Sequence, residues 1–220
     1  MKSPNLYLFK KKIKLINRYS AICASLFFIV MTFWGCGSTT LKASKPDRIT
    51  GYFMDKSESN KGTIVIDEKI PINDYKRLLY IQPNNQHFMN DKAQDIDTFA
   101  KNMVESINFF DQVADQSEFK RLLIKTGIAY KVSNISDLIG LYQVQKLFGN
   151  YLVAALDFKL TAPHLDGTNS VANLKIIDPS TMKIVYHVEH RAFVVHGFDQ
   201  PLLFPLFNSL IDWIKRNSVY

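Results

Sequence analysis

The chain has 220 residues, of which 27 are basic and 20 acidic, and its formal net charge of +7 would ordinarily suggest a nucleic-acid-binding protein. Residues 1–35, however, carry six basic residues and no acidic one, which leaves 21 basic beside 20 acidic residues in the rest of the chain. The basic excess belongs to this N-terminal segment, so nucleic acid is excluded as an expected partner. Both cysteines, Cys23 and Cys36, lie in or next to the same segment, and the rest of the chain can form no disulfide within itself.

Residues 1–35 have the pattern of an export signal. A basic stretch that ends at Arg18 precedes an uncharged, mainly apolar stretch over residues 21–34, and a cysteine follows at Cys36. The apolar stretch is short for a transmembrane helix, which needs about 20 residues. The sequence therefore predicts a targeting segment that precedes the folded protein.

The end of this segment resembles bacterial lipoprotein signal peptides. Gly35 and Cys36 match the pattern of that family, whereas Phe33 and Trp34 depart from it. The resemblance implies cleavage between Gly35 and Cys36 and acylation of Cys36, for example with palmitate. An uncleaved signal anchor is the alternative, and both alternatives place the domain across the inner membrane.

An acylated Cys36 would attach the protein to a membrane, because each buried methylene contributes about 0.8 kcal/mol and more than one chain gives stable anchoring. By resemblance to the sorting rules of enteric bacteria, Gly37 after the cysteine favours the outer membrane. We therefore expect an outer-membrane lipoprotein that faces the periplasm, with the inner membrane as the alternative.

Residues 36–62 are rich in Ser, Thr, Lys, Asp and Asn, a composition that buries too little apolar surface to offset the entropy of ordering. We predict a flexible tether here, within which residues 51–54 form a short strand or a docking segment. The remaining residues, 63–220, are predicted to form a single globular domain.

Hydrophobic periodicity predicts an α/β (α+β) domain with a mixed sheet, a C-terminal antiparallel meander and three to four packing helices. The expected strands are residues 63–67, 77–82, 109–113, 151–160, 170–178 and 183–195. The expected helices are one with its apolar face at Ile96, Phe99, Ala100, Met103, Val104, Ile107 and Phe110, one from Ser117 to Gly127, one over residues 136–148, and one that begins near Pro205.

The densest group of titratable side chains is at residues 187–190. If this segment is a strand, His187 and Glu189 share one face and His190 lies on the other, so the three do not match zinc-protease spacing. A solvated strand face is the preferred interpretation, and an envelope hydrolase that uses these residues is the alternative. The sequence predicts no catalytic residue, no cofactor and no metal site.

Trp213 falls beside the apolar stripe of the last predicted helix. Two hypotheses follow from that position. The indole either contacts a partner protein or is buried at the shoulder of the helix.

The order of these elements, together with the segments 149–154 and 177–181, resembles the small α/β domain of the TolB amino-terminal type. This domain also occurs in the curli-secretion lipoprotein and in outer-membrane lipoproteins that activate peptidoglycan synthases. The resemblance covers about residues 63–216 and implies a non-catalytic module that binds envelope proteins or forms homo-oligomers. An accessory subunit of a transporter or secretion system is the alternative role.

Overall fold

The computed structural model describes residues 44–53, 61–75, 78–83, 93–132, 134–164, 167–194 and 200–218. The chain divides into two compact units, Met1–Thr39 and Thr40–Tyr220, and all the described residues belong to the second. The predicted signal and Cys36 lie outside the described residues.

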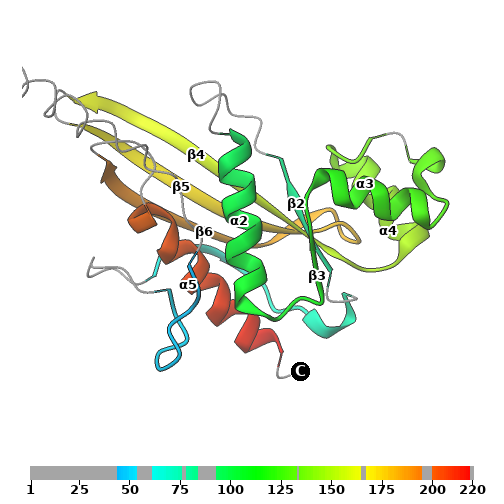
Figure 1. The fold of residues 1–220 in the computed structure, drawn as a ribbon, viewed down its shortest axis with the longest axis horizontal. Helices are drawn as coiled ribbons and strands as arrows, with labels where there is room; N and C mark the ends of the chain where they lie inside the picture. Colours follow the sequence, from blue (N-terminus) through cyan, green and yellow to red (C-terminus); the bar gives the residue numbers. More distant parts are fainter. Residues whose placement is uncertain are drawn as a thin grey trace, which may run out of the picture. The chain divides into compact units, whose positions relative to one another are not determined.

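The second unit is an α/β domain with a mixed six-stranded sheet, as the sequence predicted (Figure 1). Its strands are β1 (Thr63–Asp67), β2 (Leu78–Gln82), β3 (Gln112–Ala114), β4 (Leu152–His164), β5 (Gly167–Asp178) and β6 (Lys183–Val194), in the order β1-β6-β5-β4-β2-β3. The helices are α2 (Ala93–Ile107), α3 (Gln116–Lys125), α4 (Leu138–Phe148) and α5 (Gln200–Asn217), with short 3-10 turns at Ile72–Asp74 and Ala129–Lys131.

The strands follow two pairing modes. Strand β2 pairs in parallel with β3 and with β4, while β4, β5, β6 and β1 pair antiparallel in succession. The predicted C-terminal meander is therefore confirmed as β4, β5 and β6. The long crossovers through α2 and through α3 and α4 supply the parallel pairs, which short hairpins cannot make.

Helices α2 and α5 cover one face of the sheet, where Figure 1 shows them side by side. The expected apolar face of α2 is buried against this side, with Phe99 and Met103 almost inaccessible to solvent. Helix α5 contributes Leu203, Phe204 and Phe207 to the same core. We call this side of the sheet the covered face.

Helices α3 and α4 pack on the opposite face, over the start of β4 and over β2. The ring of Phe119 stacks on Tyr80 with centroids 4.4 Å apart, and Tyr151 lies beside it at 5.2 Å. The Tyr151 hydroxyl donates to the carbonyl of Leu141 at 2.9 Å, which fixes α4 to the sheet. A second, smaller apolar core results.

Several element boundaries differ from the prediction: the β4–β5 hairpin is longer, since β4 runs to His164 and β5 begins at Gly167, and β3 and α5 start elsewhere. Strand β3 begins at Gln112 rather than at residue 109, because the rings of Phe109 and Phe110 pack against each other and against the covered-face core. Helix α5 begins at Gln200, so Pro205 lies inside the helix and not at its first position. The apolar face that predicted this helix continues backwards through Phe204, which is buried.

Residues 44–53, which we call the N-terminal strap, dock on α5 although they fall in the predicted tether. Phe53 is 1% exposed and packs between Phe204 and Phe207, with ring centroids 5.8 and 6.3 Å away. The backbone N–H of Phe53 donates to Asn208 Oδ1 at 2.7 Å, and Asn208 Nδ2 donates to the Phe53 carbonyl at 3.0 Å. Of the two alternatives for residues 51–54, the docking segment describes Tyr52 and Phe53, and folded structure begins before residue 63.

Within the described part of the chain, no helix is both long and apolar enough to cross a bilayer.

Candidate functional site

The antiparallel half of the sheet has one polar face, opposite the covered face and beyond α3 and α4. Alternation along β4, β5 and β6 places buried Leu156, Leu174 and Val188 on the covered face, and their neighbours on the other side. These neighbours are Asp157, Asn173, Lys175, His187, Glu189 and Arg191, which we call the open face.

Polar contacts join the strands across the open face. Lys175 Nζ lies 2.6 Å from Asp157 Oδ2, and His187 Nε2 lies 3.1 Å from Asn173 Oδ1. Burial, together with the nearby Lys175 ammonium, lowers the pKa of His187 below its ordinary value. Its imidazole is therefore mainly neutral at neutral pH.

The structure separates His187 and Glu189 from His190, as strand alternation predicted. The contact of His187 is an amide oxygen, whereas catalytic nucleophile sites orient a histidine between a hydroxyl or thiol and a third group. Glu189 Oε2 lies 3.8 Å from Arg191 Nη2 on the same strand. These contacts describe a hydrogen-bonded strand surface.

A hollow of about 430 Å³ lies where the open face meets the first turn of α4. Asp157 and Lys175 lie on its sheet side, and Ser136 and Leu138 on its helix side; Met182, from the β5–β6 turn, completes the rim. Leu138 is 44% exposed and Met182 is 47% exposed, both high for large apolar side chains. We call this feature the α4 hollow.

Local sequence explains both walls of the hollow. Asp137 caps α4, since its carboxylate accepts from the backbone N–H of Gly140 at 2.7 Å and so fixes the first turn. The Gln82 side chain donates to the carbonyl of Ser136 at 2.9 Å, which ties this turn to the end of β2. On the opposite wall Met182 has a φ of 57°, a left-handed conformation that closes the tight β5–β6 turn.

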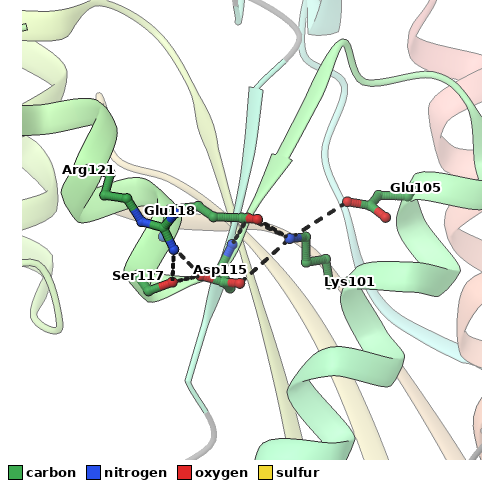
Figure 2. Close-up of polar contacts among 6 residues, drawn as sticks. All are labelled: Lys101, Glu105, Asp115, Ser117, Glu118 and Arg121. Atoms are coloured by element: carbon green, nitrogen blue, oxygen red, sulfur yellow. Dashed lines mark hydrogen bonds and ion pairs between the residues drawn. The ribbon is translucent and has the colours of Figure 1, made fainter. Parts of the chain in front are cut away.

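A second polar cluster joins α2 to α3, and Figure 2 shows it. Lys101 Nζ lies 2.5 Å from the Glu118 carboxylate, 3.5 Å from Asp115 Oδ2 and 3.8 Å from Glu105 Oε1. Asp115 and Glu118 also form a capping box, in which each side chain accepts from the backbone N–H of the other residue. We call this cluster the Lys101 brace.

The charges of the Lys101 brace reinforce one another. Burial tends to lower the pKa of Lys101, but the ion pairs with Glu118, Asp115 and Glu105 outweigh it and the net shift is upward. Burial tends to raise the pKa of Asp115, but hydrogen bonds from Glu118 and Ser117 and the Lys101 ammonium make the net shift downward. Lys101 and Asp115 thus stay ionised at neutral pH, which suits a structural link between two helices.

Of the remaining predicted site residues, the structure describes Trp213 but not Gly35 or Cys36. Gly35 and Cys36 lie outside the described residues, so cleavage and acylation stay predictions. Trp213 is fully buried: its ring stacks on Tyr186 at 5.1 Å, and its Nε1–H donates to the carbonyl of Glu68 at 3.2 Å. The hypothesis of a partner contact at Trp213 is corrected, and burial is the alternative that describes it.

Comparison with known proteins gives similar structures but no similar family. No protein-family model and no curated protein matches the chain. Solved structures that are similar include the PelC L103M dodecamer from Paraburkholderia phytofirmans, with 8% identity, a TM-score of 0.43, and coverage of 69% of this chain and 96% of that chain.

Two further similar structures come from other bacteria. Lipoprotein GNA1162 from Neisseria meningitidis is 16% identical with a TM-score of 0.36, covering 63% of this chain and 98% of that chain. The LpoB C-terminal domain from Salmonella enterica is 8% identical with a TM-score of 0.33, covering 54% of this chain and 83% of that chain. At these identities and TM-scores, we transfer neither function nor assembly to this chain.

Sequence reasoning missed both the α4 hollow and the Lys101 brace. The hollow joins the β5–β6 turn to the start of α4, which no local pattern connects. The brace had a partial signal, because Asp115 and Glu118 have the spacing of a capping box. Its cation, Lys101, comes from another helix and has no signal of its own in the sequence.

Proposed function

We propose that this chain is a lipid-anchored, non-catalytic binding or assembly module of a bacterial cell envelope, and that the α4 hollow is its docking site for a protein partner. One observation carries the choice of site: Leu138 and Met182 leave apolar surface exposed beside the charged pair Asp157 and Lys175. Partner-binding surfaces combine such an apolar centre with polar groups that orient the partner.

The leader supports the envelope location. A basic stretch, an apolar stretch and Gly35-Cys36 are the parts of a lipoprotein signal, and Gly37 favours the outer membrane by resemblance. The domain would then face the periplasm. The inner membrane is the alternative location.

The contacts of the open face favour binding over catalysis. His187 contacts the side-chain amide of Asn173, and Lys175 forms an ion pair with Asp157. Glu189 lies near Arg191 on the same strand. A hydrolase that uses His187 and Glu189 is testable with the variants His187→Ala and Glu189→Ala. A large loss of cellular function with intact folding and intact partner crosslinking would contradict the non-catalytic proposal.

Site-specific photocrosslinking in cells tests the docking site. A benzoylphenylalanine placed at Leu138 or Met182 should give a discrete crosslinked product, and the same group at Tyr130, which is 81% exposed on the 3-10 turn after α3, is the matched control. Lys175→Glu should weaken the product, since it reverses a charge in the hollow. Equal crosslinking at all three positions would contradict the proposal.

The mass of the crosslinked product separates the kinds of partner. A product of twice the chain mass would identify a second copy, whereas a larger assembly that copurifies would indicate a subunit of a transporter or secretion machine. Mass spectrometry of the native protein beside Cys36→Ser tests the anchor independently. An unprocessed, unacylated native protein would contradict the lipoprotein assignment.

A further inference from the structure

The N-terminal strap contains a tight turn that holds one aliphatic side chain in solvent. Asp47 Oδ1 accepts from the backbone N–H groups of Ile49 and Thr50 at 3.0 and 2.9 Å, and the N–H of Gly51 donates to the carbonyl of Asp47 at 2.8 Å. Gly51 has a φ of +72°, which a residue with a side chain rarely adopts. Ile49, at the tip, is 95% exposed.

The turn is fixed to α5 by Tyr52. The Tyr52 hydroxyl donates to Asp212 Oδ1 at 2.5 Å, and the ammonium groups of Lys61 and Lys215 lie 5.1 and 4.9 Å from the centroid of its ring. Lys61 Nζ also lies 2.6 Å from Asp212 Oδ2. The tip therefore has a defined position on the domain.

The surface around the tip is cationic. Lys45 and Arg48 are exposed within the strap, and Lys61 and Lys215 flank Tyr52. Two carboxylates lie nearby: Asp47 accepts from backbone N–H groups, and Asp212 binds Tyr52 and Lys61. The four cations outnumber these two carboxylates, so the net charge is positive. We call Lys45, Arg48, Ile49, Lys61 and Lys215 the tip surface.

The tip surface lies close in sequence to the predicted lipid anchor. Ser44, the first described residue, follows Cys36 by eight positions, which span at most about 29 Å even when fully extended. Acyl chains on Cys36 would therefore hold this end of the domain near the bilayer. The surface within reach of the bilayer is cationic and has an aliphatic tip, a combination that suits anionic headgroups and the acyl boundary beneath them.

We infer that the tip surface rests on the anionic phospholipid surface of the membrane that holds Cys36, with Ile49 inserted at the headgroup boundary. This inference rests on the lipid anchor in the proposed function. It adds an orientation: α5 and the strap face the bilayer. Helix α3, on the opposite face of the sheet, does not take part.

Depth measurement on the native lipidated protein tests this orientation. A nitroxide label on Ile49→Cys, in vesicles of phosphatidylethanolamine and phosphatidylglycerol, is compared with the same label on Tyr130→Cys. After processing, the introduced cysteine would be the only free thiol, because Cys23 is removed and Cys36 is acylated. Collision with a water-soluble nickel complex should be about fivefold lower at position 49 than at position 130, because a shallowly inserted group is shielded from water.

Charge variants provide the matched comparison. Lys45→Glu with Arg48→Glu should return the label at position 49 to water, and so should phosphatidylcholine vesicles or about 1 M salt, where the Debye length falls to about 3 Å. Lys120→Glu with Lys125→Glu, on α3, should leave the label immersed.

Two outcomes would overturn the inference. In one, the label at position 49 is as accessible as the label at position 130; in the other, it stays immersed in phosphatidylcholine. Mass spectrometry of the same preparation separates the two proposals, because a missing acyl group on Cys36 contradicts the anchor. An acylated protein with a water-exposed label at position 49 contradicts the orientation alone.

Discussion

The two faces of the sheet differ in what their side chains do. Among the described residues, the core of the covered face contains 30 buried residues, against 11 in the core under α3 and α4. The rest of the second face carries polar side chains, including Asp157, Lys175 and His187. The covered face therefore contributes most of the stability of the domain. Side chains on the other face can be changed with a smaller effect on the free energy of unfolding.

The covered face should give the largest loss of stability. Trp213→Ala removes a fully buried indole from its stack on Tyr186, and we expect a loss of about 3–5 kcal/mol in the free energy of unfolding. Urea denaturation measures the change. Tyr130→Ala, at an exposed position, is the control and should stay within about 0.5 kcal/mol of the parent. Similar losses in the two variants would contradict the expectation that the buried core contributes more to stability than the surface.

The Lys101 brace should give an intermediate effect. Lys101→Met leaves the carboxylates of Glu118 and Asp115 without their cation, and we expect a loss of about 1–2 kcal/mol at neutral pH for this partly exposed cluster. Urea denaturation measures the loss. Lys125→Met, an exposed change on α3, is the control.

The pH dependence of that loss has a defined sign. The pKa of Asp115 is lowered by folding, so its contribution is present above about 3.8 and is lost as the pH falls further. The pKa of Lys101 is raised, so its contribution is complete below about 10.5 and is lost as the pH rises through the folded value. The difference between parent and Lys101→Met should be largest between these limits. A difference that does not shrink as the pH falls below 3.8 would contradict the ionic account.

The open face should give the smallest effect, visible as a slope against pH. Because the pKa of folded His187 lies below its ordinary value of 6.5, the fold favours the neutral imidazole and stability falls as the pH drops below 6.5. His187→Gln should reduce the difference in the free energy of unfolding between pH 7 and pH 5.5 by less than about 0.5 kcal/mol, because solvent screens this partly exposed group. Denaturation at pH 7 and pH 5.5 measures it, with His190→Gln as the control. An unchanged slope would show that His187 does not couple to folding.

Most of the fold was predictable because periodicity is a local property. The apolar face of α2 and the alternation that separates His187 from His190 were both legible in the sequence, and the structure confirms them. The start of α5 was not, since Pro205 is a common first residue of a helix and here lies inside one. The preference of proline for the first position of a helix is outweighed here by burial of the apolar face of α5, which begins before Pro205.

The candidate sites were less predictable, because each depends on tertiary contacts. The α4 hollow brings Leu138 and Met182 together from elements 44 positions apart in the chain. The role of Asn208 depends on the backbone of Phe53, which lies 155 positions earlier in the chain. Neither residue type nor spacing in the sequence predicts such tertiary contacts.

The contact between Phe53 and Asn208 has a mechanical consequence. If the chain is pulled from the side of the predicted anchor, tension entering at Ser44 reaches the buried Phe53 ring and its two hydrogen bonds with Asn208 before it reaches β1. These hydrogen bonds link the strap directly to α5, which packs on the covered face. Tension on this end of the domain would therefore be borne first by the strap and α5, whereas the α4 hollow lies on the opposite face of the sheet.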